Sequence, residues 1–173
     1  MKQLKVYNRK AAVEYARTWA LDRNPKYKDY ELWGGDCTNF ISQCIHAGNI
    51  PFDHQGRDEL SQWYWYSDSS RTPSWTASDV FGRYILRNNN ENTDNHGIYA
   101  VEAEYNELEE GDIIQLIYEG RAFHTMIVSQ VILDDRGYLL DYLVWQHTYD
   151  LIDYPLSQKI GERRYIKILG YYN

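Results

Sequence analysis

The chain has 173 residues, of which 43% are hydrophobic and 25% are charged, so it can bury a core and fits a single domain over residues 1–173. Its 18 basic and 25 acidic residues give a net charge of -7, which disfavours binding to nucleic acids and to anionic membranes. No apolar run approaches the roughly 18 residues of a membrane helix, and the first residues lack the apolar core of a signal peptide. We therefore expect a soluble protein without membrane insertion, for which action outside the cell or at the cell wall is left open.

Two amphipathic helices are predicted in the first part of the chain. Between residues 8 and 24 the apolar side chains recur at intervals of three and four, with Asn8 as a candidate cap. A second helix is predicted after Gly34 and Gly35, with Asp36 as its candidate N-cap. The apolar stripe of this second helix consists of Phe40, Ile41, Cys44 and Ile45.

Residues 53–100 have a less regular pattern. The run WYWY at residues 63–66 is predicted to pack as an aromatic cluster across a loop or short strand, with a platform that stacks sugars or peptides as the alternative. A short apolar-periodic piece follows around residues 80–85. The asparagine-rich tract at residues 87–97 predicts an exposed loop and is a candidate cover for a cleft.

From residue 108 the pattern changes to β-branched and aromatic runs separated by turns that contain glycine, which predicts consecutive antiparallel strands. The predicted fold class is therefore α+β, with N-terminal helices packed on a C-terminal antiparallel sheet. The runs are LEEGDIIQLIY, RAFHTMIVSQVIL, YLLDYLVWQHT and RRYIKILGYY.

The only two cysteines, Cys37 and Cys44, both fall in the second predicted helix. Seven helical residues separate their Cα atoms by roughly 10 Å, beyond the limit of about 7 Å for a disulfide, so both are expected to be free thiols. Together with His46 they match no common zinc spacing, because neither a CxxC pair nor an HxxxH partner is present. We predict no structural metal and no cofactor.

Cys37 is a candidate nucleophile because of its position in the first turn of a helix. The glycines before it allow a sharp turn, and the unpaired N–H groups of a helix N-terminus favour the thiolate. The alternative is a small buried residue at the start of a core helix, which is the expectation for Cys44 on the apolar stripe. The position alone does not decide between these two roles for Cys37.

A thiol nucleophile needs a base, and five histidines are present. His46, His54 and His96 lie at a helix end or in polar loops, where solvated side chains are expected. His124 opens a predicted strand just after Gly120, and it is the candidate base.

A third group should orient the imidazole, and the hairpin after His124 limits the choice. If residues 124–134 pair with residues 138–148, the position opposite His124 falls at the end of the second strand. A two-residue turn gives His147 the face of His124, and a three-residue turn favours Gln146 instead. We select His147 as the catalytic candidate, with Gln146 as the alternative.

The residues now gathered match a known pattern. GGDCTNFISQCIHAG resembles the nucleophile segment of the family described as "Putative amidase domain", whose relatives are the NlpC/P60 and CHAP cysteine hydrolases with a papain-like fold. LEEGDIIQ and FHTMIVS are similar to the glycine-aspartate strand and the base strand of this group, and SSRTPSWTASDVFGRY and WQHTYD are similar to further segments. The resemblance covers the chain from about Tyr7 onward, and it implies Cys37 as nucleophile and His124 as base.

The resemblance also implies metal-free hydrolysis of an amide through a thioester, with the backbone N–H of Cys37 as the natural oxyanion donor. A tyrosine before Gly34 is a candidate for the second donor, and Asp36 is assigned to capping. The implied substrate is a stem peptide of bacterial peptidoglycan. Because the acidic chain does not attract an anionic wall, binding would come from aromatics such as those at residues 63–66 and Trp75, or from a separate wall-targeting domain.

Two other functions remain open at this stage. A papain-like peptidase or an acyltransferase acting on proteins or small amides would use the same residues. A non-catalytic binding module that kept the fold would carry a damaged site, whereas Cys37 and His124 are both present.

Overall fold

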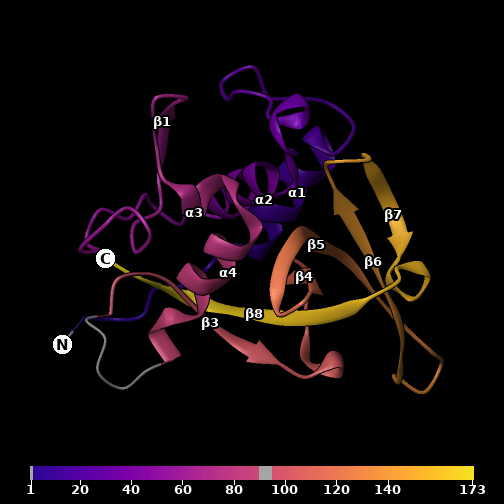
Figure 1. Cartoon of the computed structure of the whole chain (residues 1–173). Helices are drawn as coiled ribbons and strands as arrows, with labels where there is room; N and C mark the ends of the chain where they lie inside the picture. Colours follow the sequence, from indigo (N-terminus) through magenta and orange to yellow (C-terminus); the bar gives the residue numbers. More distant parts are fainter. Residues whose placement is uncertain (1, 90–94) are drawn as a thin grey trace.

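The computed structural model describes residues 2–89 and 95–173, so residues 90–94 of the expected exposed loop lie outside the described part. The N-terminal half supplies the helices and the C-terminal half supplies a sheet (Figure 1). The helices are α1 (Arg9–Trp19), α2 (Cys37–Ala47), α3 (Pro73–Thr76) and α4 (Ser78–Leu86), with short 3-10 turns η1 (Glu31–Trp33), η2 (Arg87–Asn89), η3 (Tyr105–Glu107) and η4 (Leu156–Gln158). The strands are β1 (Trp65–Ser67), β2 (Ser70–Arg71), β3 (Gly97–Ala103), β4 (Ile113–Tyr118), β5 (Arg121–Leu133), β6 (Leu139–Gln146), β7 (Leu151–Pro155) and β8 (Glu162–Tyr172).

Helix α1 begins as the sequence predicts. The Asn8 carboxamide oxygen accepts a hydrogen bond from the N–H of Ala11 at 3.0 Å, which satisfies one of the free donors of the first turn. The helix buries its small apolar face against α2. The predicted cap and the predicted amphipathic face are therefore confirmed.

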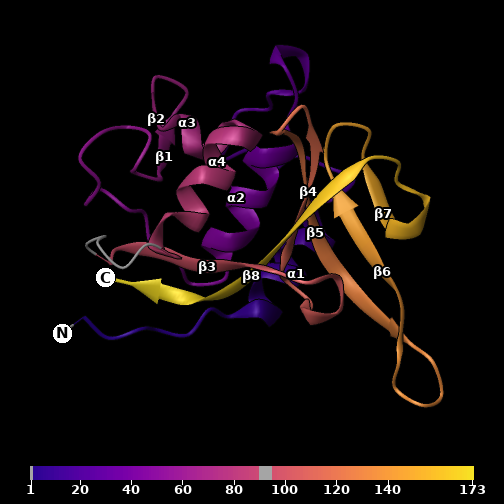
Figure 2. The same cartoon turned by 60° about the horizontal axis from the view of Figure 1, so that its bottom comes forward.

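The main sheet has six strands in the order β3-β8-β4-β5-β6-β7, and every neighbouring pair is antiparallel. Helices α2 and α4 both pack against β5, and they cover one side of the sheet in Figure 2. This confirms the predicted α+β class with N-terminal helices on an antiparallel sheet. The sequence analysis predicted no strand at residues 97–103, and β3 forms there because it pairs with the distant β8. No helix among the described residues is long and apolar enough to cross a membrane.

The central strand β4 is buried on both faces, which explains its almost continuous apolar sequence. Successive side chains of a strand point to opposite faces, so Ile113 enters the core under the helices and Ile114 enters a second cluster. That second cluster includes Met126, Val144 and Leu156. The two clusters together fix β5 and β6, the strands that carry the candidate base and its partner.

The tryptophans of the WYWY run belong to the core. Trp63 and Trp75 are fully buried, and their ring centroids are 4.7 Å apart. Trp65 is also buried, and its indole N–H donates to the Tyr30 hydroxyl at 3.0 Å. The packing interpretation is confirmed for these rings, and the stacking-platform alternative is wrong for them, because their faces are covered by other side chains.

His96 differs from the solvated side chain that the sequence analysis expected. Its ring is buried, and Nδ1 lies 2.6 Å from the carboxylate of Asp53. Tyr84 and Arg87 donate to the same carboxylate, so a buried polar cluster holds the imidazole. The sequence pattern did not indicate this burial, because the charged partner of His96 is 43 residues away in the chain.

Candidate active site

Cys37 is the first residue of α2, at the end of a sharp glycine turn. Gly34 and Gly35 have φ values of 109° and 110°, in the region that residues with a Cβ rarely adopt. A Cβ added to Gly35 would also lie 3.0 Å from the Thr148 hydroxyl, a contact that would force one of them to move. The turn therefore places Cys37 at the N-terminus of α2, the end of a helix at which the backbone N–H groups of the first turn lack partners within the helix.

Asp36 occupies the predicted N-cap position, but its side chain does not cap the helix. The carboxylate is fully buried, and it accepts hydrogen bonds from the N–H of Tyr30 at 2.9 Å and from the Asn39 amide at 2.8 Å. Its other oxygen lies 2.6 Å from Nδ1 of His147. The capping prediction is therefore wrong in its contact, because the N–H of Tyr30 and His147 from outside α2, and the side chain of Asn39 within it, contact the carboxylate in place of the backbone N–H groups of the first turn.

The Cys37 thiol lies among hydroxyl groups. Its sulfur is 3.7 Å from the Thr38 hydroxyl and 3.6 Å from the hydroxyl of Ser78, the first residue of α4. Burial by itself would raise the pKa of the thiol, but the hydrogen bond and charge of His124, followed by contacts from Ser78 and the Thr125 backbone, lower it from 9.0 to about 7. The other thiol, Cys44, has a pKa well above its usual value because it is buried on the apolar stripe.

The imidazole of His124 is held by Gln146. Its Nε2 lies 2.9 Å from the Gln146 carboxamide oxygen, which also accepts a hydrogen bond from the Lys159 ammonium at 2.6 Å. The amide nitrogen of Gln146 donates to the carbonyl oxygens of Thr148 and Tyr149, at 2.9 and 2.8 Å, so the orientation of the amide is fixed. Gln146 can then only accept from His124, which puts a proton on Nε2 and leaves Nδ1 for the thiol.

The turn between β5 and β6 explains why Gln146 is the partner. Asp134 donates its N–H to the Tyr138 carbonyl at 2.8 Å, so three residues form the turn. The pairing of β5 with β6 has two register shifts, and they are opposite in direction, so together they leave the register unchanged. At the end of the pairing away from the turn, Ile127 therefore lies opposite Trp145. Even-numbered residues of β5 therefore lie on the same face of the sheet as even-numbered residues of β6, so His124 and Gln146 share a face. The sequence analysis expected this arrangement for a turn of three residues.

His147 lies on the opposite face and does not contact His124. Its Nδ1 faces the Asp36 carboxylate at 2.6 Å, and its Nε2 faces the backbone carbonyl of Trp19 at 2.8 Å. The ring stacks on Phe40 with centroids 3.9 Å apart. Cys37, His124 and Gln146 are thus brought together, whereas His147 contacts Asp36 in the turn before α2 and holds that turn in place.

The site also contains residues that the sequence analysis did not identify. Ser78 is 41 residues from Cys37 in the chain, and no local pattern marks it. Of the tyrosines before Gly34, Tyr30 donates its hydroxyl to Asp68 at 3.0 Å, and the assignment of a second oxyanion donor stays a prediction. The backbone N–H of Cys37 stands at the N-terminus of α2, and its role as an oxyanion donor stays a prediction.

Cys37 opens into a cleft of about 400 Å³. Two aromatic rings on its walls are largely exposed, Trp33 at 74% and Phe123 at 57%. Trp33 comes from the turn before Cys37, and Phe123 directly precedes His124. Within this cleft these two rings are the exposed aromatics, whereas Trp63, Trp65 and Trp75 are buried and Tyr66, although 58% exposed, is not among the cleft walls. The cleft walls are Tyr30, Trp33, Gly34, Gly35, Cys37, Arg71, Thr76, Ala77, Ser78, Asp79, Ala122 and Phe123.

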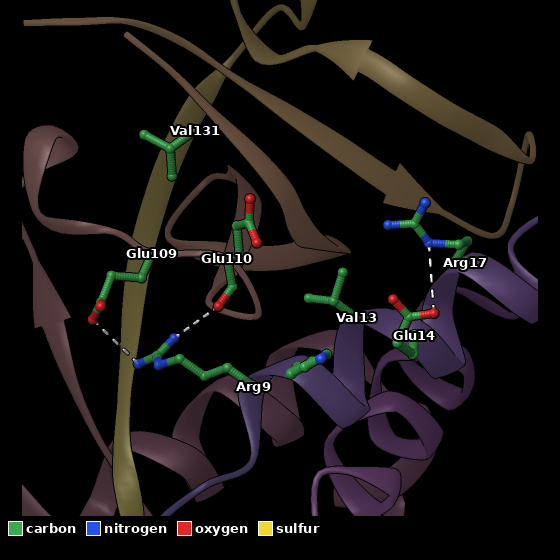
Figure 3. A pocket seen from close by; sticks show the side chains of 8 residues that line it. Arg9, Val13, Glu14, Arg17, Glu109, Glu110 and Val131 are labelled. Carbon is green, nitrogen blue, oxygen red and sulfur yellow. Dashed lines mark hydrogen bonds and ion pairs between the residues drawn. The ribbon is translucent and has the colours of Figure 1, made fainter. Parts of the chain in front are cut away.

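A second hollow of about 640 Å³ lies between α1 and the turn before β4 (Figure 3). Its charged groups largely satisfy one another, as Arg9 lies 3.8 Å from Glu109 and Arg17 lies 3.7 Å from Glu14. None of the residues around Cys37 contributes to it. Within residues 2–89 and 95–173, no three histidine, cysteine, aspartate or glutamate side chains are grouped to hold a metal ion.

A family model with the description "Putative amidase domain" matches residues 6–170. The uncharacterized protein YhbB of Bacillus subtilis (strain 168) is 36% identical over 147 residues, which cover 83% of this chain and 42% of that protein. The uncharacterized protein YjcM of the same organism is 27% identical over 175 residues, which cover 94% of this chain and 37% of that protein. The chain thus spans about two-fifths of the length of these relatives. No solved structure matches the chain significantly, so the papain-like fold stays a prediction.

Proposed function

Because the chain belongs to the family described as "Putative amidase domain", we propose that residues 1–173 form a single catalytic domain that hydrolyses amide bonds with Cys37. The observation that carries this proposal is the arrangement of one thiol at a helix N-terminus beside one imidazole, with a buried amide that fixes the imidazole. A lowered thiol pKa of about 7 at Cys37 agrees with it, since the thiolate is the reactive form.

The reaction begins with an ion pair between the thiolate of Cys37 and the imidazolium of His124. The sulfur attacks the carbonyl carbon of the amide, and the N–H of Cys37 stabilises the negative charge on the oxygen. His124 then protonates the leaving amine, which leaves an acyl group on the sulfur. Water, activated by the neutral imidazole, hydrolyses the thioester and restores the thiol. Gln146 acts as a positioning residue, because it accepts from Nε2 and keeps Nδ1 toward the sulfur.

We propose stem peptides of bacterial peptidoglycan as the substrate. This rests on the resemblance of the motifs around Cys37 and His124 to wall-cutting cysteine hydrolases. The exposed rings of Trp33 and Phe123 offer flat apolar surfaces beside the sulfur for a peptide. The net charge of -7 does not favour adsorption to an anionic wall, so a targeting segment elsewhere in a longer protein would supply that step.

The test is digestion of purified peptidoglycan, with the soluble products read by mass spectrometry. The wild-type chain is compared with Cys37→Ala and with Cys44→Ala, a matched control that removes the buried thiol. We expect cleavage by the wild type and the control and none by Cys37→Ala, and the product masses identify the bond. Cleavage by Cys37→Ala at the wild-type rate would refute the thiol mechanism. Products that arise only from proteins or small amides would refute the wall substrate and favour a peptidase or acyltransferase.

A further inference from the structure

Arg71 lies in the same cleft as Cys37, and no step of the proposed reaction uses it. It ends the short strand β2, and about a third of its side chain is exposed. The net charge of the whole chain is -7, so a cation on the wall of the cleft is opposite in sign to the molecule around it.

The guanidinium of Arg71 is held in one orientation. Its Nη1 donates to the Thr76 hydroxyl at 2.8 Å, and its carbon lies 4.8 Å from the centre of the Tyr30 ring. Its Nε lies 3.6 Å from the carboxylate of Asp68 and is buried. A guanidinium that is already fixed loses little freedom when it binds a ligand, which favours recognition of a planar anion.

The charge of Arg71 is not fully balanced by its neighbours. Asp68 is shared, because it also accepts from the Lys28 ammonium at 2.7 Å, so two cations face one carboxylate. Asp79, the carboxylate that lines the cleft itself, pairs with Arg83 at 2.8 Å. Among the described residues, Nη2 of Arg71 has no hydrogen-bond partner. One positive charge with a free donor therefore remains in the cleft.

We propose that Arg71 forms a carboxylate-binding subsite beside Cys37. It follows that the preferred amide substrate carries a carboxylate close to the bond that is cut. The statement about the substrate rests on the proposed amidase function, whereas the subsite itself can be tested with Cys37 as a reporter. Arg71 acts on binding and specificity, and the chemical step remains with Cys37 and His124.

The test compares two alkylating agents of nearly the same size, iodoacetate with a carboxylate and iodoacetamide without one. Their rates at Cys37 are measured at pH 7 by mass spectrometry, and the ratio of the two rates cancels any change in the thiol itself. We expect Arg71→Gln to lower the ratio of iodoacetate to iodoacetamide by about fivefold to tenfold, as a charge-assisted hydrogen bond in a partly exposed site predicts. Arg71→Lys should give an intermediate ratio, because it keeps the charge and loses the planar fork.

Arg136→Gln is the matched control, since it removes the same charge from the turn between β5 and β6, far from the helices in Figure 2. Its ratio should equal that of the wild type. An unchanged ratio in Arg71→Gln would overturn the subsite, whether or not peptidoglycan is cleaved. If Arg71→Gln does not fold, the subsite is tested on the wild-type protein, by measuring how far succinate and succinamide protect Cys37 from iodoacetamide. Protection by succinate and not by succinamide supports the subsite. Equal protection by both, or protection by neither, overturns it.

A substrate experiment separates this inference from the proposed function. Once digestion identifies the bond, two peptides that span it are compared, one with a carboxylate next to the bond and one with a carboxamide there. We expect the wild type to show a KM about fivefold higher for the carboxamide, and Arg71→Gln to treat the two alike. Cleavage of both peptides with equal KM by the wild type would overturn the subsite and leave the amidase intact. The amidase function is refuted by the preceding digestion if no amide is cut there, and in that case, or if neither peptide is cleaved, the alkylation ratio still decides on Arg71.

Discussion

The reactivity of Cys37 should depend on His124 in a way that the structure allows us to calculate. With a pKa of about 7, roughly one tenth of the thiol is ionised at pH 6. Burial raises the pKa, and His124 is the main group that lowers it, so His124→Ala should return the pKa to 9.0 or above. The ionised fraction at pH 6 then falls to about one thousandth, and alkylation by iodoacetamide should slow by at least about a hundredfold.

The assay is the rate of Cys37 alkylation from pH 5 to pH 10, read by mass spectrometry of the peptide that contains Cys37. The wild-type rate should fall about tenfold for each pH unit below 7, and the rates of the two proteins should converge near pH 10. Cys44 is an internal control that stays unreactive, because its pKa is raised and it is buried. An apparent pKa that stays near 7 in folded His124→Ala would refute the ion-pair argument.

Three further substitutions probe the surroundings of the pair. Gln146→Leu removes the acceptor of the imidazole N–H, and we expect kcat for the amide to fall about tenfold to a hundredfold at constant KM in steady-state assays. His147→Ala leaves the buried carboxylate of Asp36 without its closest partner, so urea unfolding should show a loss of about 3 kcal/mol in the free energy of unfolding. A loss of kcat in His147→Ala but not in Gln146→Leu would show that His147, and not Gln146, positions the imidazole. Ser78→Ala should raise the pKa of Cys37, measured by the same alkylation profile, with an effect at pH 6 of less than about tenfold.

The fold class could be predicted because helix and strand periodicities are local. Asn8 and the stripe behind Cys37 define the first two helices, and the apolar runs after residue 108 define strands. The position of β8 between β3 and β4 could not be predicted, because it depends on pairing between residues at least 45 positions apart. The strand at residues 97–103 was missed for the same reason.

The candidate site was predicted where the signal was local and missed where it depended on register or distant packing. The glycine turn marks Cys37, and the predicted strand start marked His124, although β5 itself begins three residues earlier, at Arg121. The choice between His147 and Gln146 depended on a one-residue difference in the β5–β6 turn, and each residue of the turn exchanges the two faces. The structure shows that both are buried polar residues with different partners, one bonded to the imidazole and one to Asp36.

The positions of His147 and Gln146 suggest how the two halves of the chain support one site. Gln146 ends β6 and orients His124, while the next residue bonds to Asp36, which directly precedes Cys37. The last residue of β6 and the first residue after it thus hold the imidazole and the turn that presents the thiol. This arrangement is consistent with the large expected cost of His147→Ala, although that side chain does not contact the reacting atoms.

The most direct test of the central claim, that Cys37 forms a thioester with the acyl part of an amide, is digestion of peptidoglycan in the presence of hydroxylamine. Hydroxylamine competes with water for an acyl-enzyme, so the account predicts that hydroxamates replace part of the carboxylic acid products in proportion to its concentration. Cys37→Ala should give neither product. Cleavage that yields only carboxylic acids at every hydroxylamine concentration, and that persists in Cys37→Ala, would contradict the account.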